Sequence, residues 1–246
     1  MDETQLHLAR TLFRGRIDSL RNDVMRCFWP ISNTSAADGT PAPAIIYRPP
    51  QYAPFPAMMY CCARIDYFSS FWEGWNDSNS PNRPADRNQN KRMTDFLCKF
   101  VGYPRREAVL AINVWRHKLM HTSEPRIVRS TEPRAYLWAV GVGGSCRVGE
   151  VEAYHMRLEE LPATTKDPNR SLLYFDCHEF VHDLDEGVFG PTGYFTALLN
   201  NANYEPPSSA LPPPAPPPAT RTLQQNYTDC YAEMEGYKID FSKVGL

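Results

Sequence analysis

The sequence lacks the features of several protein classes. No apolar run approaches the roughly 20 residues of a membrane-spanning helix, and the opening Met-Asp-Glu-Thr-Gln has neither the basic nor the apolar part of a secretory signal. It contains no Cys-x-x-Cys pair, no P-loop and no Gly-x-Gly-x-x-Gly pattern. We therefore expect no zinc ribbon and no nucleotide cradle, and we interpret Gly141–Gly144 as a turn.

Composition limits the remaining possibilities. The 246 residues are 42% apolar, which suits one globular domain with appendages or at most two small domains. The seven cysteines are widely scattered and odd in number. Reduced cysteines behave as small apolar residues, so we expect a protein of the reducing cytoplasm.

Charge is unevenly distributed although the net charge is only −2. Between Arg83 and Arg134 there are twelve Lys and Arg against five Asp and Glu, a local net charge of +7. Between Glu150 and Glu186 ten acids face three bases, a local net charge of −7. The basic stretch suits a polyanion, or the two stretches face each other or are simply solvated.

Apolar periodicity predicts a mainly α-helical protein. The expected helices cover 3–28, 55–75, 90–102, 105–121 and 178–201, the last interrupted near Gly190-Pro191. Short β-branched and aromatic runs predict strands at 135–142, 151–158 and 172–176. We expect a four- or five-helix bundle elaborated by a small antiparallel β-sheet, α+β overall.

The predicted domain organisation has three parts. Residues 1–205 form the helical bundle, with a β-rich insertion at about 126–176. Prolines dominate 206–221, which favours an extended linker, or alternatively a ligand for a proline-reading domain. The tail 222–246 packs back as a helix or binds in trans.

The end of the fourth predicted helix carries a candidate catalytic motif. Arg116 offers a permanently charged fork that suits phosphate oxygens. His121 has an ordinary pKa of about 6.5, suitable for proton transfer near neutral pH. Five helical residues advance about 7.5 Å, so the two side chains meet only if both lean into one cleft or if a second subunit completes the site.

Arg116 and His121 are separated by four residues, and the first of these, His117, is polar. This pattern resembles the R-x4–6-H motif of HEPN domains. The resemblance covers roughly residues 1–125, or 1–201 if the last helix belongs to the bundle. It implies a metal-independent endoribonuclease, a hydrolase without a cofactor. Many members act as homodimers in toxin–antitoxin or phage-defence systems, so RNA and an antitoxin or another regulatory protein are the implied partners.

The resemblance also implies a role for each motif residue. Arg116 would hold the scissile phosphate, and His121 would act as general acid–base on the ribose 2′-hydroxyl. His117 would fill the supporting polar position. Lys118, Arg105 and Arg106 are candidate RNA-backbone contacts.

Three alternatives remain open at this stage. Cations at a helix C-terminus complement the macrodipole without any catalytic role. Some HEPN-like domains are non-catalytic binding or oligomerisation modules. Finally, His178, Glu179 and His182 match the HExxH pattern of zinc metallopeptidases, for which Glu205 is a candidate third ligand.

Overall fold

A computed structural model describes most of the chain, namely residues 1–28, 54–76, 80–113, 127–129, 134–205 and 221–236. These residues belong to two compact units, which are described separately below. Unit 1 comprises Met1–Arg10, Ile65–Gly102 and Glu186–Leu246, and unit 2 comprises Thr11–Arg64 and Tyr103–Asp185. The predicted domain boundaries at 126, 176, 205 and 221 stay predictions.

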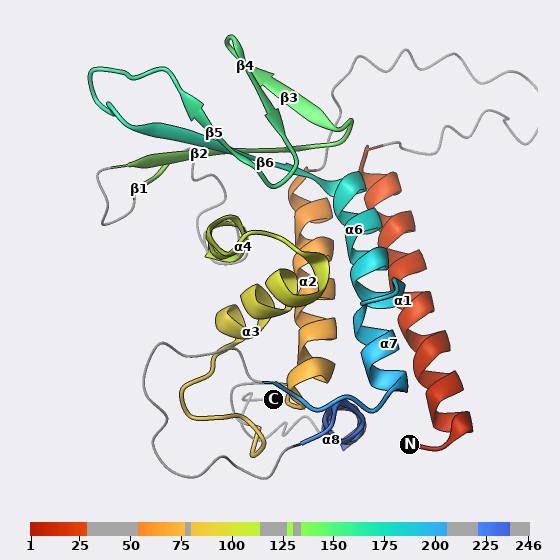
Figure 1. The fold of residues 1–246 in the computed structure, drawn as a ribbon. Coiled ribbons are helices and arrows are strands. Elements are labelled where there is room, and N and C mark those ends of the chain that lie inside the picture. The colour runs from red at the N-terminus through yellow and green to blue at the C-terminus, as the bar shows by residue number, and fades with distance from the viewer. Residues whose placement is uncertain (29–53, 77–79, 114–126, 130–133, 206–220, 237–246) are drawn as a thin grey trace, which may run out of the picture. The chain divides into compact units, whose positions relative to one another are not determined.

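The structure confirms the helical part of the prediction (Figure 1). The helices are α1 (Glu3–Phe28), α2 (Pro54–Glu73), α3 (Gln89–Phe96), α4 (Arg105–Ala111), α6 (Cys177–Phe189), α7 (Tyr194–Leu199) and α8 (Leu223–Gly236). A π-helical turn, η1 (Leu97–Val101), continues α3. The fourth predicted helix is confirmed at its start, and residues 114–121 lie outside the described part.

Apolar spacing explains why α1 forms where it was predicted. Within unit 2, Phe13, Ile17 and Leu20 follow one another at steps of four and three and are fully buried. Side chains at this spacing share one face of a helix. Local sequence also accounts for the break between α6 and α7, because Pro191 cannot continue a helix and its neighbouring glycines disfavour one.

The sheet of unit 2 is mixed, so the expectation of an antiparallel sheet is wrong in one pairing. Its strand order is β1 (Ile127–Arg129), β2 (Ala135–Gly141), β6 (Arg170–Asp176), β5 (Leu158–Leu161). β2 and β6 are parallel, whereas β1–β2 and β5–β6 are antiparallel. The chain between β2 and β6 is long enough to return and run in the same direction.

A hairpin covers one face of this sheet. β3 (Ser145–Val148) and β4 (Val151–Tyr154) pair through a tight turn, and the hairpin lies beside β6 (Figure 1). Ala153 of the hairpin packs in one cluster with Leu172 and Tyr174 of β6. The hairpin therefore supplies the apolar cover that this face of the sheet requires.

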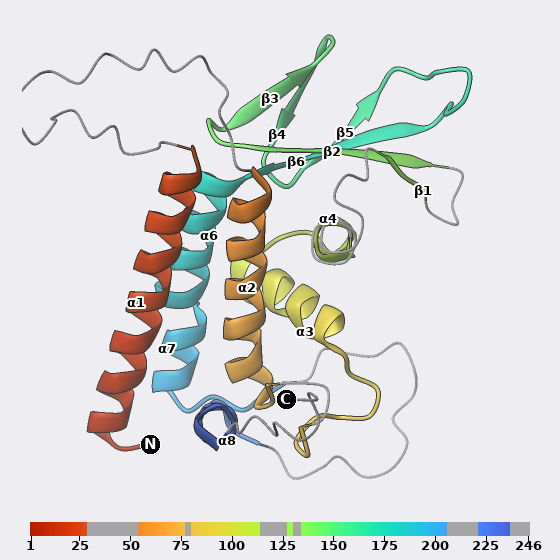
Figure 2. The same cartoon turned by 180° about the vertical axis from the view of Figure 1, so that it is seen from behind.

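The predicted tail helix is present as α8 and packs within unit 1 (Figure 2). Asn226 Nδ2 donates a 2.7 Å hydrogen bond to the carbonyl of Trp72, in the last turn of α2. Gly74 follows α2 with a φ of +79°, and a Cβ there would lie 2.9 Å from Asn226 Oδ1. Tyr227 also stacks on Phe71, with ring centroids 4.9 Å apart. These contacts make α8 an integral part of unit 1.

Buried ion pairs join α2 to α3 in unit 1. Arg92 is fully buried, donates to Asp66 at 2.6 Å and lies 3.9 Å from the centre of the Trp75 ring. Arg87 pairs with Glu73 and, at 2.7 Å, with Asp95. Each guanidinium therefore has a carboxylate partner inside the unit, as burial of a charge requires.

The chain on the two sides of residues 206–220 is paired with itself. Asn203 and Thr222 form an antiparallel bridge, and the amide of Tyr204 donates to the carbonyl of Arg221 at 2.7 Å. The predicted proline-rich linker itself lies outside the described residues. Its two ends nevertheless meet at one place in unit 1.

No helix in the described part of the chain is both long and apolar enough to cross a membrane. All seven cysteines are free thiols.

Candidate functional site

The carboxyl ends of two parallel strands meet in unit 2. Gly141, the last residue of β2, is the register partner of Asp176, the last residue of β6. α6 begins at the next residue, Cys177. Functional groups are often found at the carboxyl ends of parallel strands, so this junction is the first candidate in the described chain.

The Asp176 carboxylate is fully buried and surrounded by donors. Its Oδ1 accepts the amides of His178 at 2.8 Å and Glu179 at 3.0 Å, which caps the start of α6. Its Oδ2 accepts the amide of Gly144 at 2.6 Å and the hydroxyl of Tyr174 at 3.2 Å. The glycine turn and the helix N-terminus thus enclose the chain's own carboxylate, which explains the glycine run without a nucleotide.

A chain of hydrogen bonds continues from this junction. His155 Nδ1 accepts the amide of Asp176 at 2.8 Å, so the proton of a neutral imidazole is on Nε2. Nε2 lies 2.7 Å from the hydroxyl of Tyr103, and that hydroxyl donates to Asp183 Oδ2 at 2.9 Å. The proton order is therefore fixed: Asp176 amide to His155, His155 to Tyr103, and Tyr103 to Asp183.

Burial keeps the two central groups of this hydrogen-bond chain, His155 and Tyr103, neutral. Burial lowers the pKa of His155 to about 4, although the carboxylates of Asp183 and Asp176 act in the opposite direction. Burial and then Asp183 raise the pKa of Tyr103 well above its ordinary value. A general acid–base that works near pH 7 needs a pKa close to 7. At neutral pH these hydrogen bonds therefore hold the side chains of His155 and Tyr103 in place and do not transfer protons.

The neighbouring thiols are not placed for nucleophilic chemistry. Cys61 and Cys177 are both fully buried. Burial, followed by a hydrogen bond with Cys177, raises the pKa of the Cys61 thiol well above its ordinary value. A reactive cysteine needs thiolate character and access to a substrate. Cys177 beside His178 is thus part of the core.

The predicted catalytic motif comes after α4 in the sequence and begins five residues beyond its last residue. α4 buries Ala108 and Ala111, and its helical backbone continues through Asn113. The motif residues Arg116, His117, Lys118 and His121 lie outside the described residues. Their roles therefore stay predictions.

The other two predicted RNA contacts are on the exposed side of α4. Arg106 donates to the hydroxyl of Tyr136 on β2 at 2.6 Å, and its guanidinium lies 5.7 Å from the centre of that ring. Arg105 is also exposed. An RNA phosphate would have to compete with Tyr136 for Arg106, whose predicted role remains untested.

The HExxH residues occupy the first two turns of α6 and are exposed. His182 Nδ1 lies 3.8 Å from Asp183, whereas Glu205, the candidate third ligand, pairs with Lys99 at 3.4 Å in unit 1. Among the described residues, no three His, Cys, Asp or Glu side chains are arranged to hold a metal ion. The two histidines of the pattern, His178 and His182, thus have no third metal ligand in that part of the chain.

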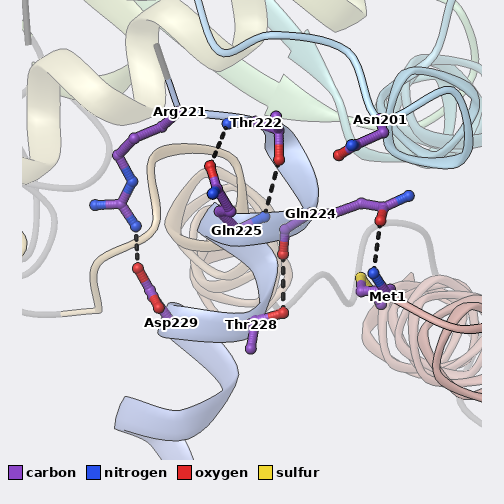
Figure 3. A pocket seen from close by; sticks show the side chains of 8 residues that line it. All are labelled: Met1, Asn201, Arg221, Thr222, Gln224, Gln225, Thr228 and Asp229. Carbon is purple, nitrogen blue, oxygen red and sulfur yellow. Dashed lines mark hydrogen bonds and ion pairs between the residues drawn. The ribbon is translucent and has the colours of Figure 1, made fainter. Parts of the chain in front are cut away.

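Unit 1 also has a surface hollow of about 670 Å³ at the start of α8 (Figure 3). Its lining consists of Met1, Asn201, Arg221, Thr222, Gln224, Gln225, Thr228 and Asp229. Most of these residues are hydrogen-bonded to one another: Arg221 pairs with Asp229, and Gln224 Oε1 accepts the N-terminal amino group of Met1 at 2.7 Å. None of the predicted site residues lines this hollow.

Comparison of the chain with protein-family models, curated proteins and solved structures found no match.

Sequence reasoning missed His155 and Asp176. Asp176 could have been found, since an Asp between a predicted strand and a predicted helix is a typical N-cap. His155 carried no such signal, because its partners Tyr103 and Asp176 are distant in the sequence.

Proposed function

We propose that the chain is a metal-independent endoribonuclease of HEPN type. Arg116 holds the scissile phosphate, and His121 is the general acid–base that activates the 2′-hydroxyl. His117 supports both groups. The products are a 2′,3′-cyclic phosphate and a 5′-hydroxyl, as expected when the ribose itself supplies the nucleophile.

The position of the R-x4-H motif in the chain carries this proposal. In the sequence the motif begins five residues after the end of α4, a helix that buries Ala108 and Ala111 and exposes Arg105. This is the context in which the sequence resembles a HEPN domain, with long helices ahead of the motif. An RNA substrate and free thiols both fit action in the cytoplasm.

The described residues also weaken the competing catalytic interpretations. His155 is neutral and buried, and Cys177 is inaccessible. His178 and His182 have no third metal ligand among the described residues. Among the candidate catalytic residues of this sequence, those of the R-x4-H motif are therefore the best supported.

The local charge supports RNA binding less than the sequence suggested. Several bases between Arg83 and Arg134 have internal partners: Arg87 and Arg92 in unit 1, and Arg106 and Arg134 in unit 2. The net charge of +7 therefore overstates the cationic surface that a polyanion can reach. This observation favours a second candidate, a non-catalytic HEPN-like module that forms a dimer or binds a regulatory protein.

Cleavage of RNA in EDTA separates the two candidates. We expect the wild type to cut single-stranded RNA and to leave the all-deoxy strand intact. Arg116→Ala and His121→Ala should each lower kcat by about 10²-fold or more, whereas Lys166→Ala, a change at an exposed position, should match the wild type. Absence of wild-type cleavage, or full activity in the two motif variants, would overturn the nuclease proposal.

A homodimer is part of the proposal, because a second subunit can complete a site whose two groups are five residues apart on a predicted helix. Sedimentation of the wild type should give twice the mass of the chain. A dimer without turnover of RNA would instead support the binding module.

A further inference from the structure

The start of α4 has an unusual anchor. Its N-cap residue is Pro104, which makes no side-chain cap hydrogen bond to the helix. Proline also lacks the amide through which a neighbouring element could hold it. The preceding residue, Tyr103, is 8% exposed and supplies the missing attachment.

The Tyr103 hydroxyl is fixed from two directions. It accepts from His155, which follows β4, and it donates to Asp183 on α6. Because His155 Nδ1 is occupied by the amide of Asp176, the imidazole cannot rotate to another partner without losing that bond. The hydroxyl is therefore held at a defined point relative to both the sheet and α6 within unit 2.

We infer that Tyr103 is a positioning residue that fixes the orientation of α4, the helix that precedes the R-x4-H motif in the sequence. The part of this inference that concerns Arg116 and His121 rests on the proposed function. Tyr103 itself is buried and has both of its hydrogen-bonding partners inside the protein, so it is not a group that contacts RNA.

A small change in the direction of α4 is sufficient to lower activity. A misplacement of about 1 Å at a reacting group can cost about 10²-fold in rate. The lost hydroxyl bond itself contributes only about 1 kcal/mol to stability. Removal of the hydroxyl should therefore reduce catalysis more than it reduces folding.

Tyr103→Phe tests the inference, and Tyr174→Phe is a matched control. Tyr174 is likewise a buried tyrosine of unit 2 whose hydroxyl donates to an aspartate, in this case Asp176. In the described part of the chain its hydroxyl bonds to Asp176 at the end of β6 and not to α4. Both variants lose one buried hydroxyl and keep the ring, so they differ mainly in which part of unit 2 loses its attachment.

Hydrogen–deuterium exchange gives a readout that needs no activity. Amides of residues 105–113 should exchange about tenfold faster in Tyr103→Phe, whereas Tyr174→Phe should match the wild type there. In the cleavage assay, Tyr103→Phe should lower kcat about tenfold or more with KM unchanged within twofold. If Tyr103→Phe does not fold, Asp183→Ala removes the hydroxyl's acceptor and should accelerate the same amides.

The outcomes distinguish this inference from the proposed function. Wild-type exchange in α4 of Tyr103→Phe, or equal acceleration in both variants, overturns the inference whether or not RNA is cut. If the wild type cuts no RNA, the nuclease proposal fails, and the exchange result alone decides whether Tyr103 holds α4. If the wild type cuts RNA and Tyr103→Phe has wild-type kcat, the link to the motif is overturned while the nuclease proposal stands.

Discussion

The two units bury polar side chains in different ways. Unit 1 uses full charges, with Arg92 against Asp66 and Arg87 against Glu73 and Asp95. In the described part of unit 2, the buried Asp176 accepts no hydrogen bond from a cationic side chain. Backbone amides and a tyrosine hydroxyl surround it instead, and a neutral histidine lies beside it.

The difference has a consequence for pH. Guanidinium groups stay charged throughout the ordinary pH range, so the pairing in unit 1 lasts until its carboxylates are protonated. The histidine of unit 2 has an ordinary pKa of about 6.5 and is buried in its neutral form. Unit 2 should therefore lose stability at a higher pH than unit 1 does, and the following predictions test this contrast.

The largest expected effect comes from breaking the charge pairing of unit 1. Arg92→Ala removes the donor to the carbonyls of Trp75 and Asn76 and leaves Asp66 without its guanidinium. We expect the free energy of unfolding to fall by about 3–5 kcal/mol, measured by urea denaturation. Arg14→Ala, at a guanidinium that is 43% exposed, is the control and should cost about 1 kcal/mol or less. Similar losses in the two variants would contradict the contrast.

The second effect is a pH dependence that belongs to unit 2. The folded-state pKa of His155 is about 4, below the unfolded value of about 6.5. The unfolded chain therefore binds a proton as the pH falls from 6.5 towards 4, while the folded chain does not. His155 should lower the free energy of unfolding by up to about 3 kcal/mol over this window and leave it unaffected above pH 7.

Comparison with His155→Gln isolates this contribution. The groups that face His155 are Tyr103, Asp183 and Asp176, and all three remain in the variant. The difference in unfolding free energy between wild type and variant should shrink by about 3 kcal/mol from pH 7 to pH 4. A difference that is constant with pH would show that His155 is not buried in its neutral form.

A third effect sharpens the description of unit 1. Gly74→Ala places a Cβ on a residue with φ of +79° and 2.9 Å from Asn226 Oδ1. We expect a loss of about 2 kcal/mol, which thermal unfolding can measure. Gly15→Ala, inside α1 and with open space around the new Cβ, should instead stabilise the protein by about 0.5–1 kcal/mol. Opposite signs at the two glycines are the decisive result.

The smallest effect concerns the start of α8. Thr222 Oγ1 accepts the amide of Gln225, and Gln225 Oε1 accepts the amide of Thr222, which together form a capping box. Thr222→Ala should cost about 1 kcal/mol. Thr228→Ala, in the exposed part of the same helix, should stay within about 0.5 kcal/mol of the wild type. Hydrogen exchange of the α8 amides would resolve the difference.

The sequence predicted the parts of the fold that depend on neighbouring residues. Phe13, Ile17 and Leu20 define α1 through their spacing alone, and Pro191 marks the break before α7. The parallel pairing of β2 and β6 was missed, because the local sequence pattern of two distant strands does not determine the direction in which they pair. One signal was present: residues 171–176 are buried without alternation, as in a strand covered on both faces.

The candidate site shows the same division. The R-x4-H motif and the exposed arginines of α4 could be proposed from adjacent residues. The bonds of Tyr103 to His155 and to Asp183 join residues 52 and 80 positions apart. Such contacts follow from the fold and not from any local pattern.

The pairing of Asn203 with Thr222 has a practical consequence. Because the chain departs from and comes back to one place in unit 1, a single peptide-bond cut between residues 205 and 221 leaves α8 attached only by its own contacts, such as Asn226 with Trp72. Its retention then becomes an equilibrium between two fragments. A synthetic peptide of residues 221–236, titrated onto a chain ending at residue 205, would convert the packing of this helix into a dissociation constant.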